Sequence, residues 1–505
     1  MTLSLGLDVG TQGTKGVLLD AESGAIVARA SKGYGLIEGL EAGAAEQHPS
    51  TWRDAVRLVI RELLATPGID AAQISAIGVS GQQHGCVVLD DKDAPVRPAK
   101  LWCDTATAVE AAELSVAFGR PVPTGFTASK LLWLARNEPA NWARTRRVLL
   151  PHDYINLLLT GEAAMEAGDA SGTGLLDILE RSFDEAAIDA FDLLANKHEA
   201  SPTDPGLASR LPRLMDPQTP WRPVGFVSDA AAVEFGLTAG TLVSAGGGDN
   251  MMSAIGSGAT TPGVVTVSLG TSGTVFAHAE QPIVDPDGLI APFCGSTGGW
   301  LPLLCVMNLT GVTEEVSTGF DMGHEALTAS ARQVPPGCEG LLWLPYLNGE
   351  RVPDLPLATG SLVGMRPGHL RAGTLYRAAL EGTSLNLAWG VERLARLGIH
   401  AKELRLVGGA ARNPLWREIL AACFNTPVIP LAEPESAALG AAMQAAWSWR
   451  HQQGAPVAMR ELSTRCVHTA GRPTLPDPDQ VALYLSIATR FRAEVSKQYD
   501  APSAK

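Results

Sequence analysis

One short turn occurs twice in this chain, and the repeat constrains the fold more than any other feature of the sequence. Residues 10–14 read Gly-Thr-Gln-Gly-Thr and residues 270–274 read Gly-Thr-Ser-Gly-Thr, each between two apolar runs. The turns stand 260 positions apart, which is about half of the 505 residues. Self-similarity at a fixed period is typical of repeated architecture. We therefore predict two halves of similar build that face each other.

Each turn joins two apolar segments, so a strand, a tight turn and a second strand are expected. Backbone N–H groups and hydroxyls in such a turn suit phosphate oxygens, and an adjacent carboxylate suits Mg²⁺. Asp8 precedes the first turn, whereas Ser268 takes the same place before the second. An ordinary hairpin would also explain one such turn, and a Walker A motif is absent. The predicted phosphate-binding residues are Thr11, Gln12, Lys15, Gly270 and Thr271, with Asp8 as the Mg²⁺ ligand.

A glycine-rich loop near the midpoint of the chain carries a single acid. Residues 244–251 read Ser-Ala-Gly-Gly-Gly-Asp-Asn-Met and follow an apolar run that predicts a strand. Glycines in series are retained where a positive φ or a close backbone approach is needed. We predict that Asp249, ionised with a pKa of about 4, is the catalytic base and that Asn250 lies beside it at the substrate. A flexible interdomain linker with a turn-forming Asp-Asn pair is the alternative.

Length and composition favour two large domains. A chain of 505 residues exceeds what one core serves, and 46% hydrophobic against 18% charged residues is enough for two buried cores. We predict domains over residues 1–246 and 247–505. The net charge of −14 argues against nucleic acid or an anionic membrane as a partner. The sequence leaves the oligomeric state open, a homodimer included.

Targeting features are not evident in the sequence. The start has no basic region and meets an acid at position 8, so no signal peptide is expected. No uncharged apolar run approaches the roughly 18 residues of a membrane span. The seven cysteines are scattered without C-x-x-C spacing, which favours free thiols over disulfides or zinc. A cytoplasmic protein is therefore expected.

Two loops in the first half offer groups that suit a polyol. A predicted buried strand at residues 74–79 is followed by Gly-Gln-Gln-His-Gly at residues 81–85, and ligands commonly bind at such strand ends. Gln83 and His84 supply donors and acceptors, although a lone loop histidine is more often structural. Trp102 would stack on an apolar sugar face and Asp104 would accept hydroxyl protons, whereas Trp102 by itself would more often belong to a core.

Residues 403–416 predict a strand, a small-residue turn and the start of a helix. Gly408, Gly409 and Ala410 would let a flat base lie against the backbone, and Asn413 follows them at the helix start. These four are the predicted adenosine-binding residues, with a plain strand-to-helix turn as the alternative. Helical stretches at residues 52–64 and 375–397 alternate with strands, which favours a mixed α/β fold.

The chain resembles the FGGY carbohydrate kinases of the actin-like ATPase superfamily, from residue 5 to about residue 439. The first signature of that family is matched throughout residues 125–137. The second fits residues 360–365 and 375–381, with Thr374 in place of the usual acid or amide. Shorter matches to the family lie at residues 46–49, 151–154, 169–173 and 344–351.

The resemblance implies two ribonuclease-H-like α/β domains with a central cleft. The sugar and the first hairpin would belong to the N-terminal domain, and the second hairpin and the adenosine site to the C-terminal domain. The implied reaction transfers the γ-phosphoryl group of MgATP to a ketopentose, with the 5-hydroxyl of D-xylulose as the first choice. Ribulose, gluconate or glycerol is the alternative substrate, and a non-enzymatic actin-like nucleotide switch is the rival outside enzymes.

Several positions depart from the family pattern. Gln83 stands where methionine is usual, and Ala410 replaces the third glycine of the adenosine motif. Cys103 and Ala106 take the places of an asparagine and an arginine. Each lost hydrogen-bonding partner weakens the penalty for a wrong sugar, so we expect looser discrimination among sugars than the family pattern suggests.

Overall fold

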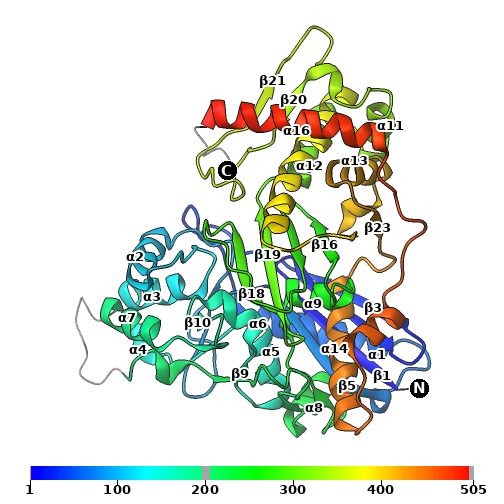
Figure 1. Ribbon diagram of the computed structural model, residues 1–505. Coiled ribbons are helices and arrows are strands. Elements are labelled where there is room, and N and C mark those ends of the chain that lie inside the picture. The colour runs from blue at the N-terminus through cyan, green and yellow to red at the C-terminus, as the bar shows by residue number, and fades with distance from the viewer. Residues whose placement is uncertain (1, 196–204, 500–505) are drawn as a thin grey trace.

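Two mixed β-sheets organise the two halves of the molecule in a computed structural model, which describes residues 2–195 and 205–499 (Figure 1). The first sheet has the strand order β13-β14-β5-β1-β2-β3, with β15 also paired to β5. Its strands are β1 (Leu3–Val9), β2 (Gly13–Asp20), β3 (Ala25–Gly33), β5 (Ile74–Gly81), β13 (Gly225–Phe226), β14 (Leu242–Val243) and β15 (Gly247–Gly248).

The second sheet repeats the central arrangement of the first. Its order is β18-β19-β17-β16-β22-β23. In the first sheet, the antiparallel hairpin β1–β2 has its first strand paired in parallel with β5. In the second sheet, the antiparallel hairpin β16–β17 has its first strand paired in parallel with β22. The strands are β16 (Val264–Leu269), β17 (Gly273–Ala277), β18 (Ile290–Cys294), β19 (Trp300–Val306), β22 (Glu403–Val407) and β23 (Val428–Pro430). The predicted repetition of the hairpin is therefore confirmed.

Parallel pairing places the chemically interesting residues at one edge of each sheet. Asp8 is in register with Lys15 across the hairpin and with Ser80 on β5. The loop after β5 thus leaves the sheet beside Asp8, because the carboxyl ends of parallel strands meet at the same edge. In the second sheet Ser268 is in register with Val407, so the turn at Gly408 leaves the sheet beside the second hairpin.

Helices cover both sheets and add a helical region to the first half, around a core cluster that includes Leu131 and Phe191. The first-half helices are α1 (Pro49–Leu64), α2 (Ala108–Phe118), α3 (Thr127–Asn137), α4 (Pro139–Arg144), α5 (Pro151–Thr160), α6 (Ala167–Ala170), α7 (Glu185–Ala195) and α8 (Asp229–Phe235). The later helices are α9 (Asp249–Gly256), α10 (Thr310–Phe320), α11 (His324–Ala331), α12 (Ala372–Arg396), α13 (Pro414–Phe424), α14 (Ser436–Gln452), α15 (Met459–Cys466) and α16 (Pro478–Tyr499). Within the described residues, no helix combines the length and the apolar character needed to cross a membrane.

Helix α14 belongs to the second half of the sequence but packs on the first sheet, against β1, β5 and α9 (Figure 1, orange). The predicted domain boundary between residues 246 and 247 falls between β14 and β15, both of which pair with β5. That boundary stays a prediction, and the chain returns to the first half after it.

Glycines allow α14 to lie directly on α9. A Cβ on Gly440 would lie 1.8 Å from the carbonyl oxygen of Met252, and one on Gly256 would lie 1.9 Å from that of Ser436. Both obstacles are backbone atoms, which cannot move aside as a flexible side chain does. The crossing of the two helices therefore requires glycine at both positions.

Replacing Gly440 with alanine should destabilise the protein by about 1–3 kcal/mol or more, because the added methyl overpacks a backbone contact. The matched control is Gly319→Ala in α10, where an added Cβ meets nothing within 4 Å. That change should leave stability equal or raise it by roughly 0.5–1 kcal/mol, since alanine favours helix over glycine. Thermal unfolding of both variants checks this, and equal midpoints would contradict the close crossing.

Candidate functional site

A cleft of about 2180 Å³ lies between the two halves and collects nearly all of the predicted site residues. The structure brings Asp8, both hairpin turns and Asp249 to its walls, together with the turn that begins at Gly408. The predicted residues that line the cleft are Asp8, Thr11, Gln12, Lys15, Gln83, His84, Trp102, Asp249, Asn250, Gly270, Thr271, Gly408, Gly409, Ala410 and Asn413. Asp104 is the one predicted site residue that is missing from this lining.

Asp249 is the first residue of α9, and the glycines before it are closely packed, with Gly246 held against backbone. Gly246 has φ of 75°, and a Cβ there would lie 2.4 Å from the carbonyl oxygen of Val79. A Cβ on Gly248 would lie 2.7 Å from Gln83 Cγ. This segment is buried and pairs with β5, so the alternative of a flexible linker is wrong.

The electrostatic surroundings of Asp249 disfavour its ionised form. Burial, and then the negative charges of Asp8 and Asp169, raise its pKa to about 8. Hydrogen bonds from the backbone N (2.8 Å) and Nδ2 (3.1 Å) of Asn250 oppose this shift, and both reach the same oxygen, Oδ1. The sequence-based expectation of a pKa of about 4 is thus corrected, because it ignored desolvation and two remote carboxylates.

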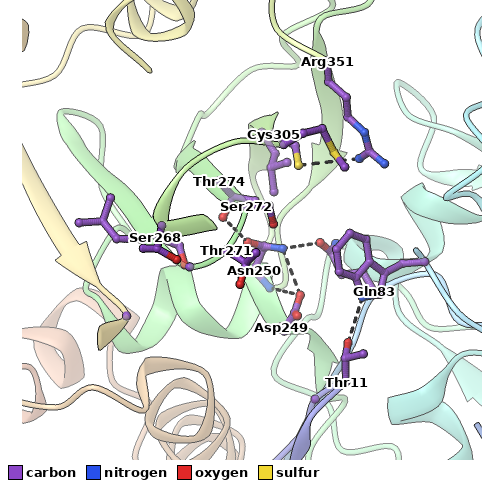
Figure 2. Close-up of a pocket in the computed structure, with 18 of the residues that line it drawn as sticks. Thr11, Gln83, Asp249, Asn250, Ser268, Thr271, Ser272, Thr274, Cys305 and Arg351 are labelled. Atoms are coloured by element: carbon purple, nitrogen blue, oxygen red, sulfur yellow. Dashed lines mark hydrogen bonds between the residues drawn. The ribbon is translucent and has the colours of Figure 1, made fainter. Parts of the chain in front are cut away.

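Asn250 connects three elements at the centre of the cleft (Figure 2). Its Nδ2 donates to Gln83 Oε1 at 2.6 Å, and its Oδ1 accepts from Thr274 Oγ1 at 2.9 Å. The side-chain amide therefore links the loop after β5 to the second hairpin, with Asp249 between them. Gln83 is also held from its other end, because its Nε2 donates to Met251 Sδ at 3.0 Å.

At the first hairpin, Asp8 Oδ1 accepts a hydrogen bond from Ser80 Oγ at 2.8 Å. Burial raises the pKa of Asp8, although this hydrogen bond and the charge of Lys15 oppose the shift. Lys15 Nζ lies 2.6 Å from Glu435 Oε2, on the segment that precedes α14. The predicted phosphate-binding lysine therefore has an acidic partner from the second half of the chain.

The hydroxyl of Thr11 joins the first hairpin to the loop at residues 81–85 and to the segment at residues 102–104. It accepts from Trp102 Nε1 at 3.0 Å and donates to Gln82 Oε1 at 3.0 Å. Trp102 is thus held by its indole N–H at the cleft wall, with its ring available for stacking. Because these contacts occupy the hydroxyl of Thr11, its backbone is the part left for a phosphate.

Asp104 does not reach the cleft, so the geometry gives no support to the prediction that it accepts sugar hydroxyl protons. Its side chain is fully buried, and its Oδ2 lies 3.1 Å from Lys100 Nζ and accepts from the backbone N of Ala45 at 3.0 Å. A buried carboxylate must be paired and hydrogen-bonded, and these partners fix Asp104 as a structural residue. Lys130 is likewise structural, since its Nζ donates to the carbonyls of residues 124, 125 and 126.

Sequence reasoning missed several residues at the far end of the cleft, on α10, α11 and α12. Asn413 caps α13 through its Oδ1, and its Nδ2 donates to Thr328 Oγ1 at 3.0 Å. His324 Nδ1 lies 3.0 Å from the hydroxyl of Tyr376, and both residues line the cleft. Arg351 also lines it, from the segment after β20 (Leu342–Leu344), as Figure 2 shows. No local motif marks His324 or Thr328, whereas Tyr376 and Arg351 lie in segments that matched the family pattern, at residues 375–381 and 344–351.

Comparison with known families supports a two-domain assignment. The N-terminal domain of the FGGY family of carbohydrate kinases matches residues 3–256, and the C-terminal domain of the same family matches residues 265–449.

Curated relatives cover nearly the whole chain. A xylulose kinase from Haemophilus influenzae is 37% identical over 98% of this chain and 100% of its own length. A xylulose kinase from Streptomyces coelicolor is 36% identical over 91% of this chain and 90% of its own.

Solved structures agree on the fold. A "xyloylose kinase" from Brucella ovis superposes with a TM-score of 0.87 at 31% identity, covering 99% of both chains. A gluconate kinase from Lactobacillus acidophilus gives a TM-score of 0.85 at 25% identity, also over 99% of both chains.

Proposed function

Because this chain belongs to the FGGY family of carbohydrate kinases, we propose that it phosphorylates D-xylulose to D-xylulose 5-phosphate with ATP. The observation that carries the proposal is the position of Asp249 in the cleft. It lies between a loop rich in hydrogen-bonding groups, after β5, and the second glycine-threonine hairpin. The names of the full-length relatives support the choice of sugar.

On the sugar side, the proposed contacts are Gln83, His84, Trp102 and Asn250. Gln83 and Asn250 are already hydrogen-bonded to each other, so their remaining donors and acceptors are fixed before a ligand arrives. Preorganised polar groups cost less to order on binding than mobile ones. The indole of Trp102 would cover the apolar face of the sugar.

On the nucleotide side, the two turns offer backbone N–H groups to the phosphates, and the turn at Gly408 offers a flat surface to adenine. Gly408 has φ of 91°, and a Cβ there would lie 2.6 Å from the carbonyl oxygen of Leu269. A Cβ on Gly409 would meet nothing within 4 Å, so the backbone there is open for contact. We propose Asn413 as a further contact, because it ends this turn and lines the cleft.

We propose Mg²⁺ as the metal that accompanies ATP, with Asp8 as its protein ligand. The described residues contain no group of three or more His, Cys, Asp or Glu side chains that would hold a metal alone. The single carboxylate of Asp8 fits Mg²⁺, which usually binds through one or two carboxylates together with waters and substrate phosphates. When bound, the ion neutralises charge on the phosphoryl group that is transferred.

Asp249 is the proposed general base, and its raised pKa predicts a pH dependence. The base must be deprotonated to accept the sugar hydroxyl proton. Since burial and the charges of Asp8 and Asp169 raise the pKa to about 8, kcat/KM should rise with pH up to that value. Below it, each pH unit should cost about tenfold. Rates from about pH 6 to about pH 9 check this, and a flat profile below pH 7 would contradict the assignment.

A panel of sugars tests the substrate. We expect the highest kcat/KM for D-xylulose among D-xylulose, D-ribulose, L-ribulose, xylitol, gluconate and glycerol, with a preference about tenfold weaker than a complete set of contacts would give. Ala106 is exposed next to Asp104, so Ala106→Arg has room and should sharpen the preference. Best turnover of glycerol or gluconate would refute the xylulose assignment. An unchanged ratio of kcat/KM between D-xylulose and the other sugars in Ala106→Arg would refute the explanation for the loose preference.

Gluconate is the second candidate, because a gluconate kinase shares this fold over 99% of both chains.

We also propose that the protein acts in the cytoplasm. The described residues include all seven cysteines as free thiols, which suits a reducing compartment. Whether the protein forms a homodimer stays a prediction.

A further inference from the structure

A buried carboxylate that the sequence analysis did not single out contacts His84, in the loop at residues 81–85. Asp169, in α6, is fully buried and sits between two histidines. Its Oδ1 lies 3.3 Å from His84 Nδ1 and 3.4 Å from the backbone N of the same residue. Its Oδ2 lies 3.0 Å from His152 Nδ1. Asp169 is therefore placed to act on His84, which lines the cleft.

The surroundings of Asp169 keep it ionised and prevent it from turning away. Although burial raises its pKa, the two histidines outweigh burial, and the pKa lies below its ordinary value. On the other side of its ring, His152 Nε2 lies 2.9 Å from Asp153 Oδ1, without a well-aligned hydrogen bond within the described residues. The backbone N of Asp169 donates to Glu166 Oε1 at 2.6 Å, which anchors the start of α6.

His84 is held with equal firmness, in a conformation that points Nδ1 at Asp169. Its φ is 61°, and its ring packs between Phe126 and Phe293 at centroid distances of 5.4 and 5.3 Å. Gly172 leaves room for the ring, because a Cβ there would lie 1.7 Å from His84 Cε1. Nδ1 is buried and has no well-aligned hydrogen bond within the described part of the chain. Nε2 is then the ring nitrogen left for a ligand in the cleft.

We propose that Asp169 is a positioning residue for phosphoryl transfer, which holds a proton on Nδ1 of His84 so that Nε2 accepts a sugar hydroxyl. This rests on the proposed function, which puts the sugar at His84. In a neutral imidazole one nitrogen donates and the other accepts, and the partner of one nitrogen decides the role of the other. A carboxylate beside Nδ1 favours the proton there, and the bound hydroxyl would draw the ring into alignment.

The same carboxylate also faces the catalytic loop. A Cβ on Gly248, the residue before Asp249, would lie 3.1 Å from Asp169 Oδ1. The charged and titratable groups that interact with Asp169 are thus His84, His152, Asp153, Glu166 and Asp249. After burial and Asp8, the charge of Asp169 contributes to the raised pKa of Asp249. One side chain therefore acts on both the sugar ligand and the proposed base.

The substitution Asp169→Asn removes the charge and keeps the shape, and Asp153→Asn is its matched control. Asp153 is equally buried and contacts the same His152, but it has no contact with His84. We expect Asp169→Asn to raise the KM for D-xylulose by roughly ten- to a hundredfold, the range for losing a hydrogen bond assisted by charge. The rise of kcat/KM with pH should move to lower pH. In Asp153→Asn the KM and the pH profile should stay close to wild type.

A double-substitution cycle separates action through His84 from general damage. In a His84→Asn background, Asp169→Asn should raise the KM no further. Additive losses, or an equal loss in Asp153→Asn, would overturn the inference and leave the proposed function intact. If His84→Asn alone left the KM unchanged, the inference would fail, and so would the placement of the sugar at His84 in the proposed function.

A measurement on the wild-type protein keeps the inference testable if Asp169→Asn does not fold. Histidine ¹⁵N resonances, with His84 assigned by its loss in His84→Asn, should show a ring protonated at Nδ1 and bare at Nε2. The opposite tautomer, or an even mixture, would overturn the proposal.

Discussion

Replacing Asp249 with asparagine is expected to lower kcat by roughly 10²- to 10⁴-fold while D-xylulose and ATP still bind. The amide keeps the shape of the side chain, and its oxygen can still accept from the backbone N of Asn250, as Oδ1 does at 2.8 Å. It cannot accept the hydroxyl proton. A coupled kinase assay gives kcat, and calorimetric titration with sugar and with a non-hydrolysable ATP analogue gives the two affinities.

Stability provides the control against a trivial loss of folding in Asp249→Asn. Burial and neighbouring carboxylates raise the pKa of Asp249 from 3.8 to about 8, so ionisation above pH 3.8 disfavours the folded state progressively, up to about pH 8. The asparagine variant lacks this penalty, and its thermal midpoint should equal or exceed that of the wild type as pH rises toward 8.

Asp354→Asn is the matched control for activity. Asp354 is an exposed residue of the cleft, and its substitution should keep kcat within about twofold, as surface changes away from the chemistry do. Near wild-type kcat in Asp249→Asn would require another base.

Asp8→Asn is the change with the second largest expected effect, a loss of roughly 10²-fold or more in MgATP-dependent turnover. A loose phosphoryl-transfer transition state depends on positioning and charge neutralisation, and the proposed Mg²⁺ ligand serves both. Ser80 Oγ, which lies 2.8 Å from Asp8 Oδ1, can still contact the amide oxygen. Turnover should therefore become more dependent on Mg²⁺ concentration, with the fold preserved.

Two comparisons make the Asp8 result specific. Binding of ATP measured without Mg²⁺ should be similar in wild type and Asp8→Asn, because no ion is then involved. Asp20→Asn, at the opposite end of the same hairpin and in register with Leu3, should leave the Mg²⁺ dependence unchanged. Full sugar-dependent turnover in a folded Asp8→Asn variant would rule out the metal role.

The features that were predicted correctly from the sequence depend on a few consecutive residues. The two hairpin turns follow from local glycine and threonine patterns between apolar runs, and the glycines before Asp249 follow from backbone conformation and close approach. The family assignment rests on the same local signatures, spread over the length of the chain. The two halves followed from the repeated turn, the mixed α/β class from helical stretches that alternate with strands, and the cleft from the family resemblance. The structure and its relatives confirm this fold.

The errors concern side chains whose environment comes from distant segments. Asp104 follows a strand end, as a ligand-binding residue would, but Lys100 and the backbone of Ala45 occupy it in the interior. The cleft residues on α10 and α11 carry no local signature, because only the fold turns these helices toward the turn at Gly408.

The sequence by itself determined where the chain turns and which chemical groups it offers, since a turn depends on the φ preferences and hydrogen bonds of a few consecutive residues. Only the tertiary structure decided which of those groups share the cleft and in which protonation state. Asp249 shows the difference most clearly. Its place after three glycines is local, whereas its pKa of about 8 depends on burial and on Asp8 and Asp169, which lie 241 and 80 positions earlier in the chain. Desolvation and charge act through space, and distance in space is fixed only when the sheets and helices have packed.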